Sequence, residues 1–199
     1  GQGTRKLDRA RLIGLGAALL ALRAGERAGW LGETPSAGRQ AGFKLAARML
    51  AGSSEPGAQW RAGDAGELSG DHDSPDAALI RPSGKHLLIG DFLGDLSGLE
   101  AALHRAASLG ARGVLVQVLH PDEEDFPFQG AMRFRAPSGG GQHLTRDAAG
   151  LAAAYRARLE ARRAALRDLA AGAGFGFAAH SLRHSAGEGL IGLWGALSA

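Results

Sequence analysis

The carboxylate of Asp91 is the first side chain in this sequence that could do chemistry, because it follows a short apolar run. Residues 85–96 read KHLLIGDFLGDL, in which HLLI is typical of a buried strand of a parallel sheet. Open α/β sheets bind ligands beyond the carboxyl ends of their strands. Asp91 is therefore either a ligand or metal contact, or a residue that caps a helix or bonds within a loop. Asp95 is expected to be a solvated or capping carboxylate.

A second candidate is the acidic and aromatic segment that follows the strand VLVQVL. It contains Asp122, Glu123, Glu124, Asp125, Phe126 and Phe128. Paired carboxylates can transfer protons, but four consecutive acids are more typical of a charged loop. We interpret the segment as a partner-binding loop in which the two phenylalanines are apolar anchors. The equally open alternative is that both aromatic rings tuck under the sheet.

Two groups of side chains have the types, but not the placement, of metal ligands. Residues 71–73 read Asp-His-Asp, yet the surrounding segment offers no rigid partner that would preorganise a site. His180 and His184 have the spacing of a helical metal pair. They straddle the end of a predicted strand, however, where that spacing does not bring the two rings together. We interpret both histidines as structural.

Phosphate chemistry has little support in the sequence. Arg156, Arg163 and Arg167 share one flank of a predicted helix, but Glu160 lies among them and is expected to form ion pairs three and four residues apart. The glycine run at 139–141 is not followed by the Lys-Ser or Lys-Thr pair and the helix of a phosphate loop.

The elements that would hold these side chains alternate between helices and strands. Helices are predicted over about 4–24, 38–51, 97–109, 147–171 and 185–197, and strands over 28–32, 86–92, 114–119 and 175–182. This order predicts one domain over 1–199, built as an open, mostly parallel α/β sheet flanked by helices. Residues 52–84 are predicted to form a long irregular loop. Residues 121–147 are predicted to form a protruding acidic-aromatic loop and a hairpin.

Composition limits the function classes. The net charge of +3 comes from 23 basic and 20 acidic residues that are dispersed, so nucleic acid is not an expected partner. The chain has no cysteine, which excludes disulfides and thiolate metal sites. The longest apolar run, Leu12 to Leu22, is shorter than the roughly 20 residues that cross a bilayer. No membrane span is expected.

Several segments together resemble the DUF58 family, bacterial members of the von Willebrand factor A group. They are KLDRARLIGLGAALLALRAGERAGWLG at 6–32, LLIGDFLGDL at 87–96 and VLVQVLHPDEEDFPFQG at 114–130, followed by the helix with Tyr155, Leu159 and Leu166. The resemblance covers essentially the whole chain and implies a Rossmann-like sheet. In complete members it also implies a metal-ion-dependent adhesion site, where hydroxyls and carboxylates hold Mg²⁺.

Only one part of that adhesion site is matched. Asp91 corresponds to the aspartate after the family's fourth strand, whereas the Asp-x-Ser-x-Ser motif of the first strand has no counterpart. Ser69 and Ser74 lie near the place of the family's middle threonine, in no recognisable motif. We therefore expect this chain to lack the family's first strand and to bind no Mg²⁺ tightly. The absence of that strand would leave the strand at 86–92 with an open edge for self-association.

The resemblance implies a non-enzymatic protein–protein interaction module in the bacterial cytoplasm, with a MoxR-type AAA+ ATPase as partner. Its binding surface would be the carboxyl edge of the sheet around Asp91 and the 52–84 loop, with residues 122–128 as a second contact. The alternative is a Mg²⁺-dependent α/β hydrolase that uses Asp91 as a metal ligand.

Overall fold

The structure is a computed structural model that describes residues 5–51, 75–135, 142–145 and 148–198, with side chains for 5–48, 75–131 and 149–196. The Asp-His-Asp cluster at 71–73, Ser69, Ser74 and the glycine run at 139–141 lie outside the described residues.

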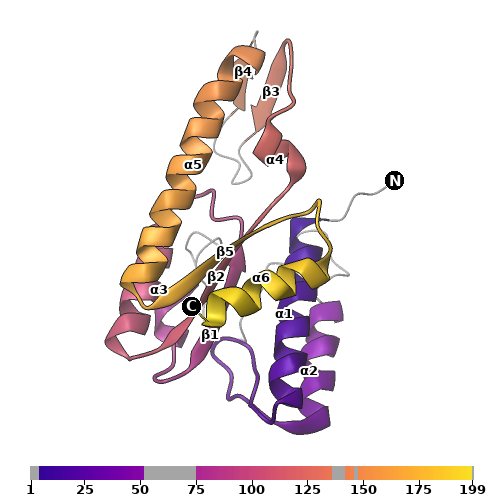
Figure 1. Ribbon diagram of the computed structural model, residues 1–199, viewed down its shortest axis with the longest axis vertical. Helices are drawn as coiled ribbons and strands as arrows, with labels where there is room; N and C mark the ends of the chain where they lie inside the picture. Colours follow the sequence, from indigo (N-terminus) through magenta and orange to yellow (C-terminus); the bar gives the residue numbers. More distant parts are fainter. Residues whose placement is uncertain (1–4, 52–74, 136–141, 146–147, 199) are drawn as a thin grey trace.

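Three parallel strands form the main sheet, in the order β1-β2-β5 (Figure 1). They are β1 (Lys85–Gly90), β2 (Arg112–Leu119) and β5 (Phe175–Ser181). The register places Leu88 of β1 beside Leu115 of β2, and Leu115 beside Phe177 of β5. Within the described residues β1 pairs only with β2, so its other side is an edge. The predicted open parallel α/β sheet flanked by helices is confirmed.

Helices cover both faces of this sheet. One face carries α3 (Ser97–Ser108) and α5 (Ala148–Gly172), and the other carries α1 (Lys6–Arg23) and α6 (Ala186–Ser198). Helix α2 (Gly38–Ala51) packs against α1. Because each strand is joined to the next by a helix on the same face, the connections have the regular form of parallel βαβ units.

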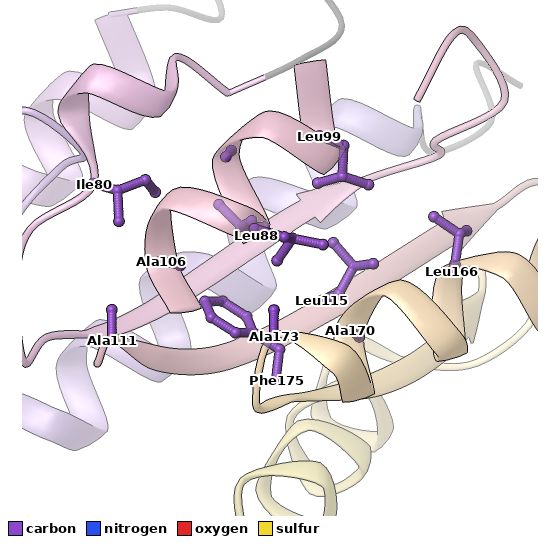
Figure 2. Packing of buried hydrophobic residues seen from close by; sticks show 12 residues of the cluster. Ile80, Leu88, Leu99, Ala106, Ala111, Leu115, Leu166, Ala170, Ala173 and Phe175 are labelled. Atoms are coloured by element: carbon purple, nitrogen blue, oxygen red, sulfur yellow. The ribbon is translucent and has the colours of Figure 1, made fainter. Parts of the chain in front are cut away.

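The alternation of side chains along the strands produces two apolar clusters. Leu88 and Leu115 point toward α3 and α5, where they meet Leu99 and Leu166 (Figure 2). Valines 114, 116 and 118 of β2 face the opposite layer, where they pack with Ile13 of α1 and Leu193 of α6. Strand β2 is consequently buried from Gly113 to Leu119, as expected of a central parallel strand.

Smaller elements complete the fold. They are the 3₁₀ turn η1 (Ala77–Leu79), the short helix α4 (Pro121–Asp125) and an antiparallel ribbon of β3 (Met132–Arg135) and β4 (Gln142–Thr145). Helix α4 lies where the sequence predicted irregular loop. It forms because Pro121 supplies a preset first helical residue and His120 and Glu123 cap each other's backbone.

The strand predicted at 28–32 is wrong. That segment makes a single bridge between Ala28 and Ser36 and then turns back, with Glu33 N donating to Trp30 O at 3.0 Å. Gly32 has a φ of 86°, a left-handed conformation that an extended strand cannot contain. The predicted strand at 86–92 ends early at Gly90, because Phe92 has a φ of 50° and turns the chain out of the sheet.

Among the described glycines, Gly113 and Gly176 lie closest to the backbone of a neighbouring element. A Cβ added at Gly113 would lie 1.9 Å from the backbone oxygen of His86 in β1. A Cβ at Gly176 would lie 2.2 Å from the backbone oxygen of Ala196, where α6 crosses β5. Neither obstacle is a flexible side chain, so only movement of the sheet or of α6 could accommodate a methyl group.

We predict that Gly113→Ala and Gly176→Ala each lower the free energy of unfolding by about 3 kcal/mol, because both methyl groups overlap backbone. Gly192→Ala is the matched control. Gly192 lies in α6 with nothing within 4 Å of an added Cβ, so alanine should raise stability there by about 0.5–1 kcal/mol. Urea unfolding of the three variants measures the difference. Equal effects at all three positions would contradict this account of the packing.

Candidate functional site

An ammonium group and two carboxylates meet beyond the carboxyl ends of β1 and β2. Lys6 Nζ lies 2.6 Å from Asp91 Oδ2 and 2.5 Å from Glu123 Oε1. Asp91 directly follows β1, Glu123 lies in α4 after β2, and Lys6 is the first residue of α1. The three side chains are about equally shielded, with 30%, 35% and 28% of Lys6, Asp91 and Glu123 exposed.

The two carboxylates set the charge state of Lys6. Burial by itself lowers the pKa of Lys6, but the hydrogen bonds and negative charges of Asp91 and Glu123 outweigh it. The net pKa of Lys6 is raised above its usual value of 10.5, so the group is an ammonium throughout the neutral range. This cluster is therefore one cation held between two anions.

Helix α4 positions Glu123 for two contacts at once. Glu123 Oε2 accepts a hydrogen bond from the backbone N of His120 at 2.9 Å, while Oε1 binds Lys6. The His120 ring accepts in return from the backbone N of Asp122 at 3.2 Å. The helix cap thus holds one oxygen of the glutamate, and the other oxygen binds Lys6 at the start of α1.

A buried amide connects this cluster to α5. Gln117 of β2 is 0% exposed, and its Nε2 donates to the backbone oxygen of Asp91 at 2.9 Å. Arg163 Nε donates to Gln117 Oε1 at 3.4 Å, and the same guanidinium pairs with Glu124 at 2.7 Å and Glu160 at 3.0 Å. Because both ends of the amide have partners, Gln117 can stay in an otherwise apolar strand.

The aromatic residues after α4 take different environments. Phe126 is 8% exposed and stacks on Tyr155 of α5, with ring centroids 4.6 Å apart. Phe128 is half-buried and meets the Phe126 ring edge-on at 5.1 Å. Burial, followed by the charge of Glu123, raises the pKa of Tyr155. Phe126 thus packs within the molecule.

The four acids predicted to bind a partner also differ in exposure and in ion pairing. Glu123 and Glu124 are each largely shielded and held by Lys6 and Arg163. The side chains of Asp122 and Asp125 are 55% and 54% exposed, and Asp125 pairs with Arg183. Asp122 is therefore an exposed acid whose ion pair, with His120, is made within its own helix cap, whereas Phe128 is half-buried beside it.

Arg9 of α1 holds the carboxyl end of β5 through a histidine. Arg9 Nη1 lies 2.9 Å from His180 Nε2 and also donates to the backbone oxygen of His184. Since a guanidinium can only donate, His180 Nε2 must accept, which places the imidazole proton on Nδ1. Burial and then the Arg9 charge lower the pKa of His180, so the ring is neutral at pH 7.

Other sequence candidates are not brought together. His184 points to Glu188, with 3.3 Å between Nδ1 and Oε1, rather than to a site shared with His180. Asp91 does not cap α3, which begins at Ser97, but accepts from the backbone N of Leu93 at 3.4 Å. Asp95 accepts from the backbone N of Ser97 at 3.1 Å and so holds the start of that helix.

The arrangement around Asp91 does not fit a ready Mg²⁺ site. Its carboxylate and that of Glu123 converge on an ammonium group, not on an open position. In the part of the chain that the structure describes, no cluster of three or more histidine, aspartate or glutamate side chains could hold a metal ion. A Mg²⁺ ion at Asp91 would first have to displace Lys6, and among the described residues it would find two carboxylates, those of Asp91 and Glu123.

Sequence reasoning missed Lys6, Gln117, Arg163 and Arg9 as parts of this edge. Gln117 carried a usable signal, because it is the one polar side chain inside the apolar run VLVQVL. Lys6 is one of only three lysines in an arginine-rich chain, which is a weak signal. Nothing in the spacing of Arg9 indicates its contact with a residue 171 positions away.

Comparisons with protein-family models, with curated proteins and with solved structures find no match to this chain. The geometry must therefore carry the functional argument. Among the described helices, none is long and apolar enough to cross a membrane.

We predict that Lys6→Met destabilises the protein by about 1–2 kcal/mol, because it leaves Asp91 and Glu123 facing each other without a cation. The value lies between the contribution of an exposed pair and the cost of breaking a buried one. It corresponds to a fall in melting temperature of roughly 2–8 °C. Adding Glu123→Gln to Lys6→Met should recover part of the lost stability, because it removes one of the two facing negative charges. A Lys6→Met protein that melts like the wild type would contradict this role.

We also predict an acid-sensitive stability that depends on His180. Its pKa is lowered in the folded protein, so the unfolded chain binds more protons and stability must fall as the pH drops through the usual histidine pKa of 6.5. His180→Gln retains an acceptor for Arg9 but cannot titrate, and should flatten this fall. His104→Gln, at an exposed position of α3 that takes no part in the Arg9 contact, should leave it unchanged. Thermal melts between about pH 7.5 and pH 5 compare the three proteins, near the reference histidine pKa.

Proposed function

We propose that this protein is a non-enzymatic protein–protein interaction module of the DUF58 and von Willebrand factor A type. The observation that carries the proposal is the cluster of Lys6, Asp91 and Glu123 at the ligand-binding edge of the sheet. The acids best placed for catalysis or metal binding there are neutralised by a cation of the same chain. An enzyme would need one of them free to take a proton or to hold a metal.

The proposed contact surface is the carboxyl edge of the sheet, continued by the exposed part of residues 122–128. Asp122 gives this surface a negative charge, and Phe128 adjoins it with a partly exposed ring. Charged rims steer partners and aromatic residues anchor them. The expected partner surface is therefore basic, with an apolar recess for Phe128.

The resemblance to DUF58 proteins identifies a partner class for the same proposal. It is a MoxR-type AAA+ ATPase, met in the bacterial cytoplasm. The Rossmann-like, von Willebrand A form of the sheet belongs to this proposal. The unpaired side of β1 would be the position for a strand supplied by a second copy, because open edges are templates for pairing.

The alternative is a Mg²⁺-dependent hydrolase in which Asp91 is a metal ligand. One feature favours keeping it: Asp91 and Glu123 already approach a common cation within hydrogen-bond distance. It requires Lys6 to leave that position and a further group to complete the metal shell. The interaction module needs neither change.

We predict that the protein binds the MoxR-type ATPase of its own organism, measured by calorimetry, and that Asp122→Arg weakens this binding by about tenfold or more. The charge reversal should act because a rim aspartate becomes a like charge facing a basic partner. Glu26→Gln, which changes an exposed acid just beyond the C-terminal end of α1, is the control and should bind normally. Unchanged binding by Asp122→Arg would place the contact elsewhere.

Turnover assays and Mg²⁺ calorimetry on the same purified protein distinguish the interaction module from the hydrolase. The module should show no turnover of phosphate esters or nucleotides with Mg²⁺, and calorimetry should detect Mg²⁺ binding no tighter than millimolar. A turnover that disappears in Asp91→Asn, or a one-to-one micromolar Mg²⁺ site, would replace the module with the enzyme.

A further inference from the structure

The N-terminal helical segment carries a charge that the rest of the chain does not share. Residues 1–51 contain nine lysines and arginines against three acids, whereas residues 52–199 contain fourteen against seventeen. The first segment is therefore at +6 and the remainder at −3. This asymmetry is hidden by the small net charge of the whole chain, and it marks α1 and α2 as a strongly cationic unit.

Exposed apolar side chains gather on the same layer of the structure. Among the described residues, the large hydrophobic side chains that are exposed are Leu7, Leu12, Leu19 and Leu20 of α1, Phe43 of α2, Ile191 and Trp194 of α6, and Leu151 of α5. Only the last lies on the opposite face of the sheet. A concentration of exposed apolar groups on one side of a protein marks an interaction surface.

Helices α1 and α2 combine the two features on one surface. Leu12 and Leu19 are two helical turns apart on α1 and are 54% and 42% exposed. Leu19 lies against α2, because a Cβ added at Gly42 would be 3.1 Å from its side chain. Gly42 adjoins Phe43, the ring of which is 74% exposed. From these positions we infer that the three side chains form one apolar strip across the helix pair.

Cations border this strip. Arg39 precedes Phe43 by one turn of α2, Lys44 follows it, and Arg23 follows Leu19 by one turn of α1; all three are exposed. Helix α2 contains no acid. We call Leu12, Leu19, Phe43, Arg23, Arg39 and Lys44 the α1–α2 surface. Exposed apolar groups within a cationic border are the features of helices that lie in the headgroup region of a bilayer.

We propose that the α1–α2 surface binds a membrane surface rich in anionic lipid. Phe43, Leu12 and Leu19 enter the boundary between headgroups and acyl chains, and Arg39, Lys44 and Arg23 bind lipid phosphates. In this proposal the protein lies on the bilayer rather than in it, in keeping with the described helices, none of which is long and apolar enough to cross. The proposal does not depend on the interaction module, which uses the carboxyl edge of the sheet.

The charge of the surface selects lipid over the other occupants. A two-fold dimer through the α1–α2 surface would place one +6 segment against another, and this repulsion disfavours a second copy. A nucleic acid would satisfy the cations but would leave the leucines and the phenylalanine without apolar contacts. An anionic bilayer satisfies both kinds of group.

Sedimentation with vesicles tests the proposal on the full chain. Phosphatidylcholine vesicles containing phosphatidylglycerol should pull down the protein, and vesicles of phosphatidylcholine alone should bind it much less. Phe43→Ser should weaken binding about tenfold, because it removes one inserted aromatic ring. The double variant Arg39→Gln/Lys44→Gln should weaken it about tenfold or more, since each charge near an anionic surface contributes several-fold.

Matched controls come from the opposite side of the molecule. Leu151→Ser removes an exposed apolar side chain of α5, and Arg105→Gln/Arg158→Gln removes two exposed cations of α3 and α5; neither should change vesicle binding. All variants alter exposed positions, and melting curves verify that they are folded. Absence of binding to anionic vesicles, or equal losses in test and control variants, would overturn the proposal.

Two further results would also overturn it. One is dimerisation in the absence of lipid that Phe43→Ser abolishes, which would assign the surface to a second copy. The other is a DNA duplex bound more tightly than anionic vesicles and weakened by Arg39→Gln/Lys44→Gln but not by Phe43→Ser. Vesicle binding that responds to the cations and not to Phe43 would likewise exclude insertion.

Discussion

The burial of β2 on both faces is the constraint on which the rest of this structure depends. Seven consecutive residues of this strand are shielded from water, so two layers of helices must be supplied to cover them. Helices α3 and α5 follow directly from the chain's path between parallel strands. Helices α1 and α6 come from the chain before β1 and after β5. At the carboxyl edge, Lys6 and Arg163 join α1 and α5 to the segments that follow β1 and β2.

The sequence predicted this framework because its signals are local. An apolar run of strand length, a helix ending at Gly110 and a leucine pattern along α5 each depend on neighbouring residues. Two local misreadings have local causes. The segment predicted as a strand forms a turn, because Gly32 has a left-handed conformation. The segment predicted as a loop contains α4, because His120 and Glu123 cap the helix reciprocally. Both depend on backbone conformation that composition alone does not reveal.

The candidate site was less predictable, because its contacts are distant in sequence. Asp91 was identified from its place after a strand, but its partners are 85 residues before it, in Lys6, and 26 residues after it, in Gln117. An acid at a strand end has the same local sequence whether it faces a metal, a partner or an ammonium group. Only the packing of α1 across the sheet edge decides between them, and that packing is a property of the whole fold.

The position of α6 has a consequence for protein synthesis. The valines of β2 are covered by Ile13, which is made early, and by Leu193, which is made 74 residues after Leu119, the last residue of β2. Until α6 leaves the ribosome, this face of the nascent sheet is only partly covered and β1 already has a free side. Incomplete chains with exposed apolar surface and open strands associate readily. A message truncated before α6 should therefore yield a product that needs chaperones, although it contains all three strands of the main sheet.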